Sequence, residues 1–229
     1  MSNGPVMVIT GASSGIGEAT ARRAAEFDYR LVLAARSEQR LQALAEQLGS
    51  DRAVAVRCDV TSWDDQQAVV RTAIERFGAV DVFFANAGFG AKRGFLEDSV
   101  EHWKAMVDTN VLGAALSIRA ALARFREQGS GHMLLTSSVA GRRFLPGSLY
   151  SATKFAVTAM GHSLRSEVAD SDIKVTLVEP GIVDTPFFEQ KPEHALEPDD
   201  VARAVMFALT QPPHVDVNEI LVRPLRQGT

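Results

Sequence analysis

The stretch Val6-Met-Val-Ile-Thr10-Gly11-Ala-Ser-Ser-Gly15-Ile-Gly17 decides how this chain folds. A short apolar run ends in a turn that holds three glycines, and a helical pattern follows at once. Glycines in such a turn allow a tight bend and a close approach of the backbone to a phosphate, which then sits at the helix N-terminus. The stretch therefore predicts a strand, a phosphate-binding turn and a helix, although its spacing, G-x-x-x-G-x-G, differs from the commoner G-x-G-x-x-G.

The same turn also fits a second pattern. Gly11-Ala-Ser13-Ser14-Gly15 reads G-x-S-x-G, the nucleophile elbow of α/β-hydrolases. That site needs an oxyanion loop from an earlier strand, whereas Ser13 follows the first strand of this chain. A glycine-rich turn without any ligand is a further alternative. We favour the nucleotide site, with binding by Gly11, Ser13, Ser14, Gly15, Ile16 and Gly17.

The rest of the chain repeats the strand–helix unit. Continuous apolar runs, typical of parallel strands covered on both faces, alternate with helical patterns, and no linker or repeat interrupts them. This predicts one α/β domain over residues 1–229, a Rossmann-type doubly wound parallel sheet with helices on both faces. The expected strands are Val6–Thr10, Arg30–Ala35, Ala53–Arg57, Val80–Ala85, His132–Ser137, Lys174–Val178 and Glu219–Val222. The expected helices are Ile16–Phe27, Glu38–Leu48, Asp64–Phe77, Val100–Arg126, Tyr150–Val168 and Asp199–Leu209.

Composition excludes several classes of protein. A formal net charge of -4 argues against nucleic-acid binding. The single cysteine, Cys58, cannot form an intrachain disulfide and is expected to be a buried thiol. The start lacks the basic region of a signal peptide, and no apolar stretch approaches the about 20 residues that span a bilayer. The five histidines show no metal-binding spacing. We expect a cytoplasmic protein without membrane contact, catalytic metal or nucleic-acid partner.

The end of the second strand bears on the choice of cofactor. An acidic residue there would hydrogen-bond the 2′-hydroxyl of an adenosine ribose, whereas an arginine would accept a 2′-phosphate. This chain has Ala35 at the position of the acid, and Arg36 follows it. A guanidinium can grip a phosphate with two hydrogen bonds, although a lone arginine at a strand end is often only solvated. We therefore predict NADP(H) in preference to NAD(H).

Tyr150-x-x-x-Lys154 begins the fifth helical pattern. Residues four apart on a helix share a face, so the phenol and the ammonium can point into one cavity. The pKa of a phenol is about 10, so a phenol is a poor acid or base at neutral pH unless that pKa falls. A nearby cation lowers that pKa. The pair is therefore a candidate general acid/base.

Several spaced motifs follow one another from end to end of the chain. In chain order they are Thr10-Gly-Ala-Ser-Ser-Gly-Ile-Gly17, Asp59-Val60, Asn86-Ala-Gly88, Asn110-Val-Leu-Gly113, Ser137-Ser138-Val-Ala-Gly141, Tyr150-x-x-x-Lys154, and Pro180-Gly181 with Thr185. Together these motifs resemble the short-chain dehydrogenase/reductase family. The resemblance implies a seven-stranded sheet of order 3-2-1-4-5-6-7 and nicotinamide-dependent interconversion of an alcohol and a carbonyl.

The resemblance also implies roles for single residues. Tyr150 would exchange a proton with the substrate oxygen, and Ser138 would hydrogen-bond that oxygen. Lys154 would bind the nicotinamide ribose and lower the Tyr150 pKa, while Asn110 would hold a water in a proton relay. Asp59 and Val60 would flank the adenine, and Thr185 would bind the carboxamide. The cofactor cleft would further include Asn86, Ala87, Gly88, Pro180, Gly181 and Val183.

Structural roles remain open for several of these residues. Asn110 could be a mid-helix polar residue, Ser138 a loop cap and Asp59 a helix N-cap. Ser138 lies twelve residues before Tyr150, whereas thirteen is commoner in the family, and Ser137 lies at thirteen. We choose Ser138 because it directly precedes Val-Ala-Gly, which makes the following loop one residue short and puts the substrate pocket wall in doubt.

The substrate pocket is the least determined part of the sequence. Arg142 and Arg143 could attract a carboxylate, or form a solvated loop face. A segment of a dozen residues after Thr185 would give a small lid and an open pocket. The candidate pocket residues are Phe89, Arg142, Arg143, Phe144, Leu149, Phe187 and Phe188.

Two functions are consistent with the sequence. The first is an NADP(H)-dependent carbonyl reductase or alcohol dehydrogenase, which the intact set of Asn110, Ser138, Tyr150 and Lys154 favours. The second is an NADP(H)-binding sensor or interaction protein without turnover. The resemblance implies a homodimer or homotetramer. Four apolar residues could serve the core or that interface: Trp103, Met106, Leu116 and Phe125.

Overall fold

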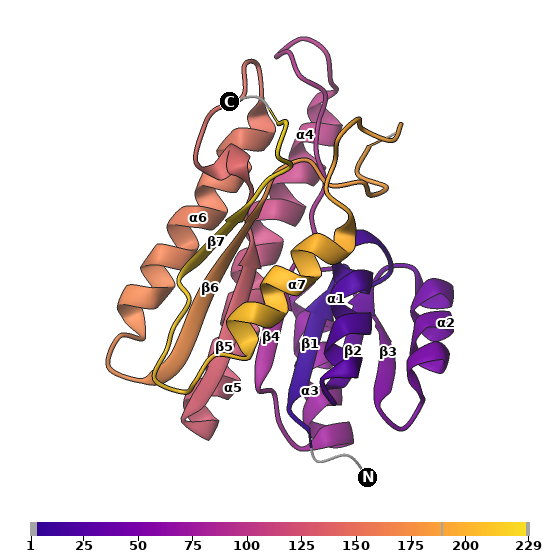
Figure 1. The fold of residues 1–229 in the computed structure, drawn as a ribbon, viewed down its shortest axis with the longest axis vertical. Helices are drawn as coiled ribbons and strands as arrows, with labels where there is room; N and C mark the ends of the chain where they lie inside the picture. The colour runs from indigo at the N-terminus through magenta and orange to yellow at the C-terminus, as the bar shows by residue number, and fades with distance from the viewer. Residues whose placement is uncertain (1–3, 189, 228–229) are drawn as a thin grey trace.

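The apolar runs form one parallel sheet in the computed structural model, which describes residues 4–188 and 190–227 (Figure 1). The strand order is β3-β2-β1-β4-β5-β6-β7, so the expected Rossmann-type topology is confirmed. From β1 the chain adds strands toward one edge of the sheet, and from β4 it adds strands toward the other edge. A crevice therefore opens between the loops that follow β1 and β4. The strands are β1 (Val6–Thr10), β2 (Arg30–Ala35), β3 (Ala53–Arg57), β4 (Val82–Ala85), β5 (Ser130–Thr136), β6 (Asp172–Pro180) and β7 (Glu219–Val222).

Two apolar layers hold the sheet between its helices (Figure 1). Strand β1 shows the alternation: Met7 and Ile9 belong to one core cluster, and Val6 and Val8 belong to the other. The first layer is covered by α1 (Gly15–Glu26), α2 (Glu38–Leu48) and α7 (Pro198–Leu209). The second is covered by α3 (Trp63–Phe77), α5 (Gly113–Gln128) and α6 (Leu149–Glu167). Burial on both faces explains why the strands are apolar throughout.

The helix expected over Val100–Arg126 is divided. It consists of α4 (Val100–Val107), a π-helical turn (Asp108–Leu112) and α5. The side chain of Asn110, inside the turn, hydrogen-bonds the backbone of the loop after β4. One wide turn of this kind redirects a helix and is frequent at functional sites. Periodicity alone did not indicate it, because the apolar pattern continues across the turn.

The run Val100–Gln128 is long and apolar enough to cross a membrane by length and composition alone, with a mean hydropathy of 1.2. This differs from the expectation that no apolar stretch is so long. Met106, Ala121 and Phe125 of this run are buried, the last two in the core layer beneath the sheet. Packing on the sheet therefore accounts for apolar residues along one side of the run. Of the residues considered for a subunit interface, Met106 and Phe125 belong to this buried set.

Candidate active site

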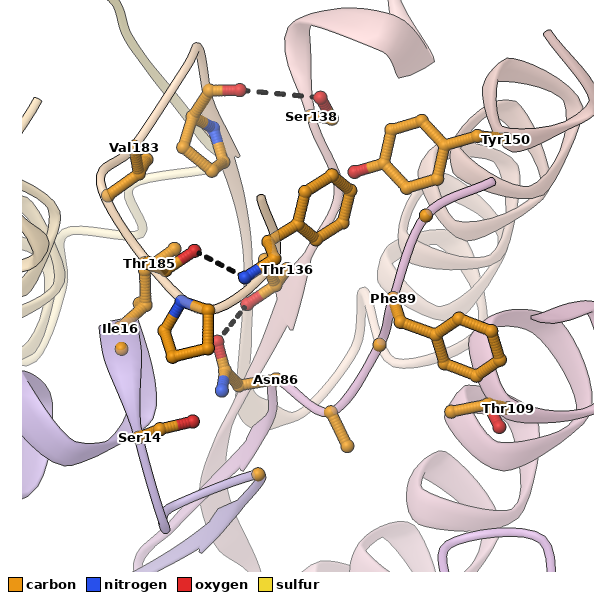
Figure 2. Close-up of a pocket in the computed structure, with 18 of the residues that line it drawn as sticks. Ser14, Ile16, Asn86, Phe89, Thr109, Thr136, Ser138, Tyr150, Val183 and Thr185 are labelled. Carbon is orange, nitrogen blue, oxygen red and sulfur yellow. Dashed lines mark hydrogen bonds between the residues drawn. The ribbon is translucent and has the colours of Figure 1, made fainter. Parts of the chain in front are cut away.

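A cavity of about 640 Å³ extends across the carboxyl ends of the central strands (Figure 2). Its walls come from the glycine-rich turn after β1, the loops after β2 to β6, and the start of α6. Nearly all of the residues predicted to bind cofactor line it. Gly17 does not, because it is buried behind the turn.

The glycine-rich turn needs its glycines for two physical reasons. Gly11 and Gly15 have φ values of 68° and 57°, in the left-handed region that other residues avoid. A side chain at Gly17 would overlap the carbonyl oxygen of Gly11. Ser14 is the N-cap of α1, and its side chain forms no capping hydrogen bond. The turn thus offers backbone without side chains, a hydroxyl that makes no capping bond and a helix N-terminus to an anion.

Asn86 ties three neighbouring strands together at the edge of the cavity, and its bond to Thr136 is visible in Figure 2. Its side-chain nitrogen donates to the Thr10 carbonyl oxygen at 3.1 Å, and its side-chain oxygen accepts from the Thr136 hydroxyl at 3.1 Å. The backbone N–H of Asn86 donates to the Thr10 hydroxyl at 3.0 Å. Asn86 therefore holds the carboxyl ends of β1, β4 and β5 in place around the cavity.

Tyr150 and Ser138 lie together at one end of the cavity, and the Tyr150 hydroxyl points into it on the Ser138 side (Figure 2). Burial raises the pKa of the Tyr150 phenol to about 12, and its hydrogen bond with Ser138 lowers that pKa by less. Burial also lowers the pKa of the Lys154 ammonium to about 8. In this arrangement desolvation sets the phenol pKa, rather than the Lys154 charge as the resemblance led us to expect.

The two adjacent serines have different surroundings. The Ser137 hydroxyl donates to the Lys154 carbonyl oxygen at 3.1 Å and lies 2.7 Å from the Thr158 hydroxyl, so it binds helix α6. The Ser138 hydroxyl accepts from the Ala140 N–H at 3.1 Å and faces Tyr150. The twelve-residue spacing therefore places Ser138, not Ser137, beside the phenol.

Asn110 is buried beneath the cavity and does not line it, whereas its neighbour Thr109 does. Its side-chain oxygen accepts from the Phe89 N–H at 3.0 Å, and its nitrogen donates to the Phe89 carbonyl oxygen at 2.9 Å and to the Thr153 hydroxyl at 3.1 Å. Asn110 thus clamps the loop after β4 to α6. Its oxygen keeps a second lone pair, and the water-holding role stays a prediction.

The opposite end of the cavity is cationic. Arg36 and Arg40 both line it, and neither guanidinium forms a hydrogen bond or ion pair within residues 4–188 and 190–227. Ser37, the N-cap of α2, also lines the cavity and makes no side-chain capping bond. The sequence interpretation missed Arg40 and Ser37, although both follow Arg36 closely enough to share the first turn of α2.

Asp59 lies at the same end and is held by its own loop. Its carboxylate accepts from the Thr61 N–H at 3.0 Å and from the Thr61 hydroxyl at 2.8 Å. These bonds lower the Asp59 pKa, and the nearby Arg36 adds a smaller effect. The N-cap of α3 is Ser62, not Asp59. Beside Asp59, the buried Cys58 has its pKa raised to about 12 by burial, which keeps its thiol protonated at neutral pH.

The loop after β6 is fixed by the C-terminal segment. The side-chain oxygen of Gln227 accepts from the Ile182 N–H at 3.0 Å, and Gln227 lines the cavity itself. Pro180, Gly181, Val183 and Thr185 line the cavity as predicted. Gln227 lies outside every motif, so no signal in the sequence indicated it.

The wall beyond Tyr150 only partly matches the expected substrate pocket. Phe89, Phe187 and Phe188 line the cavity, and the Phe187 ring packs edge-on to Tyr150 at 5.4 Å between ring centres. Four expected residues, Arg142, Arg143, Phe144 and Leu149, do not line it. The wall instead contains Arg93 from the β4–α4 loop and Val139, Leu145 and Ser148 from the β5–α6 loop.

Arg142 binds a buried acid instead of lining the cavity. Its Nε atom donates to both carboxylate oxygens of Glu179, each at 2.8 Å, and Glu179 is fully buried. A buried carboxylate requires a partner, so Arg142 turns toward the sheet and away from the cavity. A second acid, Glu219, accepts from the same guanidinium. Within the described residues, no group of three His, Cys, Asp or Glu side chains is arranged to hold a metal ion.

Comparisons with known proteins agree with this arrangement. Residues 5–196 match the family model of short chain dehydrogenases. An uncharacterized oxidoreductase of Staphylococcus haemolyticus is 42% identical over 227 residues, which cover 97% of this chain and 98% of the relative. An alcohol dehydrogenase from the archaeon Thermococcus sibiricus, complexed with 5-hydroxy-NADP, superposes with a TM-score of 0.91 at 35% identity and 98% coverage of both chains. A 3-ketoacyl-(acyl-carrier-protein) reductase from Brucella melitensis, complexed with NADH, gives 0.90 at 31% identity, covering 97% and 98%.

Proposed function

This chain belongs to the short chain dehydrogenase family of NAD(P)-dependent oxidoreductases, and we propose that it uses NADP(H) to interconvert an alcohol and a carbonyl. One observation carries the proposal: a single cavity has Ser138, Tyr150 and Lys154 at one end and Arg36 and Arg40 at the other, and neither arginine has a partner among the described residues. The structural relatives hold NADP-type and NADH cofactors alike, so the preference rests on the residues of this chain.

The cavity suits a dinucleotide in its shape and in its free polar groups. The glycine-rich turn leaves room where side chains would collide, and Ser14 and Ser37 leave their hydroxyls without a capping bond at two helix N-termini. Arg36 and Arg40 would hold the 2′-phosphate, and Thr185 the carboxamide. A bound nicotinamide would supply the hydride, whereas the protein supplies the proton and the orientation.

Tyr150 is the proton donor in this proposal. Its pKa of about 12 keeps the phenol protonated at neutral pH, which suits reduction of a carbonyl. Ser138 would orient the carbonyl oxygen toward that phenol. The Lys154 ammonium, charged below a pKa of about 8, would stabilise the phenolate left after proton transfer. We therefore favour carbonyl reduction as the direction that this geometry serves best.

The test is NADPH oxidation with a panel of aldehydes, ketones and oxo acids. We expect Tyr150→Phe to reduce turnover at least about 100-fold while NADPH binding, followed by cofactor fluorescence, is unchanged. Tyr29→Phe is the matched control, because Tyr29 is the only other tyrosine and is absent from the cavity wall. Binding without turnover of any carbonyl would favour the sensor, and turnover that survives in Tyr150→Phe would remove the phenol as donor.

A homodimer or homotetramer and a cytoplasmic location remain part of the proposal. Val107, Leu112 and Phe155 are exposed on the helical run that includes α4 and the π turn, and on α6. Such apolar side chains are more often covered than left in water when they lie together. Light scattering after gel filtration measures the subunit number directly.

A further inference from the structure

The cavity wall beyond Tyr150 is mostly apolar and contains one arginine. Phe89, Phe187 and Phe188 form an aromatic side, and Val139 and Leu145 add aliphatic surface. Leaving aside the Tyr150–Lys154 pair and the cationic end at Arg36, Arg93 is the single ionisable side chain among the described lining residues. Arg93 is itself exposed, and a cation at the edge of an apolar pocket favours a ligand of opposite charge.

The backbone on both sides of Arg93 is tethered. The Lys92 N–H donates to the Asp98 carboxylate at 3.0 Å, and the Gly94 N–H donates to the Gly147 carbonyl oxygen at 2.8 Å. The second bond joins the β4–α4 loop to the β5–α6 loop, which supplies Leu145 and Ser148 to the pocket. Arg93 therefore sits at the seam between the two loops that wall this part of the cavity.

The seam depends on close backbone contact. Gly94 and Gly147 have φ values of 104° and 62°, and a Cβ added at Gly147 would lie 2.8 Å from the Gly94 nitrogen. Other residues are therefore excluded at Gly147 on both conformational and steric grounds. The two loops thus meet through glycine backbones, and Arg93 lies beside this contact.

The Arg93 guanidinium has no partner of its own among the described residues. Asp98, in the same loop, already accepts from Lys92 and Ser99 and lies 3.8 Å from the His102 ring nitrogen. Glu97, the other acid of this loop, forms no ion pair within the described part of the chain. The contrast with Arg142, which a buried carboxylate occupies, leaves Arg93 as the cation available to a ligand here.

We propose that Arg93 binds a carboxylate of the substrate, so that this site reduces oxo acids with an apolar or aromatic body. The inference rests on the proposed function. The planar guanidinium matches a carboxylate through two parallel hydrogen bonds. In the reaction the carbonyl carbon gains the hydride of NADPH and the oxygen gains the Tyr150 proton. The C=O group becomes CH–OH, the cofactor is oxidised, and the carboxylate at Arg93 is unchanged.

A matched pair of substrates tests the inference. Para-carboxybenzaldehyde and methyl para-formylbenzoate share an aldehyde and an aromatic body, and differ in the negative charge. We expect Arg93→Gln to lower kcat/KM for the acid roughly 10-fold and to leave the ester within about twofold. Arg143→Gln is the control, because this exposed arginine has the same charge and lies outside the cavity. An equal loss for acid and ester, or no loss for either, overturns the inference while the proposed reaction stands.

Binding gives a readout that does not need turnover. In a Tyr150→Phe background, quenching of NADPH fluorescence measures the Kd of both compounds. We expect Arg93→Gln to weaken binding of the acid roughly 10-fold and to leave binding of the ester nearly unchanged. Added salt should weaken binding of the acid to the protein that keeps Arg93. If the acid binds the Arg93→Gln protein as tightly as it binds the parent, Arg93 does not bind the carboxylate. Failure of the Tyr150 parent to reduce any carbonyl would instead reject the proposed function.

Discussion

The Lys154 ammonium nitrogen lies 5.6 Å from the centre of the Tyr150 ring, and its hydrogen bond goes to the Thr136 carbonyl oxygen at 2.8 Å. The two groups share a cavity end without a direct hydrogen bond between them. Burial disfavours the charged form of each group, the phenolate and the ammonium. It therefore raises the pKa of Tyr150 and lowers the pKa of Lys154. The pKa values are consequently about 12 for Tyr150 and about 8 for Lys154.

This relationship predicts which group limits activity at high pH. As pH rises through about 8, Lys154 loses its proton, whereas Tyr150 stays protonated until about 12. We expect kcat/KM for carbonyl reduction to fall above about pH 8, following the loss of one proton. Lys154→Arg keeps its charge and should move the fall to higher pH. A falling limb at the same pH in Lys154→Arg would assign that ionisation to another group.

Cofactor preference should depend on the cationic end of the cavity. Arg36→Ala and Arg40→Ala each remove one partner of a 2′-phosphate, so we expect kcat/KM with NADPH to fall roughly 10- to 100-fold and that with NADH to change little. Arg57→Ala is the control, because Arg57 is exposed at the end of β3 and outside the cavity. Inhibition by adenosine 2′-monophosphate should weaken in parallel. Equal losses with both cofactors would contradict the phosphate role.

The buried Glu179 makes a prediction about stability. Arg142→Ala would leave its carboxylate without the guanidinium whose Nε donates to both carboxylate oxygens, at a cost of about 3–5 kcal/mol in the free energy of unfolding. Adding Glu179→Gln to that variant should recover much of the loss, because the unpaired charge disappears. The neighbouring, exposed Arg143→Ala should change stability by no more than about 0.5 kcal/mol. Urea denaturation measures all three, and an Arg142→Ala protein as stable as the parent would refute the account.

The sheet was predictable because its strands carry their own signal. β1, β2, β3 and β7 begin and end as expected, since apolar residues stop where the turn residues start. β6 extends beyond the expected Lys174–Val178 to Asp172–Pro180, because it pairs along its length with β5 and at its end with β7. The π turn around Asn110 was not predictable, since the side-chain bonds that accompany it reach Phe89, 21 residues earlier in the chain.

The candidate site likewise has one part that the sequence predicts and one part that it does not. Motif residues such as Asn86 and Tyr150 lie at strand or helix ends, so chain order places them together at one edge of the sheet. The substrate wall depends on loop paths. Arg142 was a reasonable candidate from its position, but the partner that removes it, Glu179, lies 37 residues further along the chain. Arg93 enters the wall through a backbone contact between two glycines, which leaves no pattern in the sequence.

Gln227 should position the loop that lines the nicotinamide end of the cavity. Its side-chain oxygen accepts the Ile182 N–H at 3.0 Å, and loss of one such bond is worth about 1 kcal/mol. We expect Gln227→Ala to raise the KM for NADPH roughly fivefold with kcat changed less than about twofold. Gln227→Glu keeps an acceptor oxygen and should restore the KM, whereas Arg226→Ala, an exposed neighbour outside the cavity, should leave it unchanged. A fall in kcat at constant KM, or a KM that Gln227→Glu does not restore, would show that the segment acts on the site in some way other than by holding Ile182.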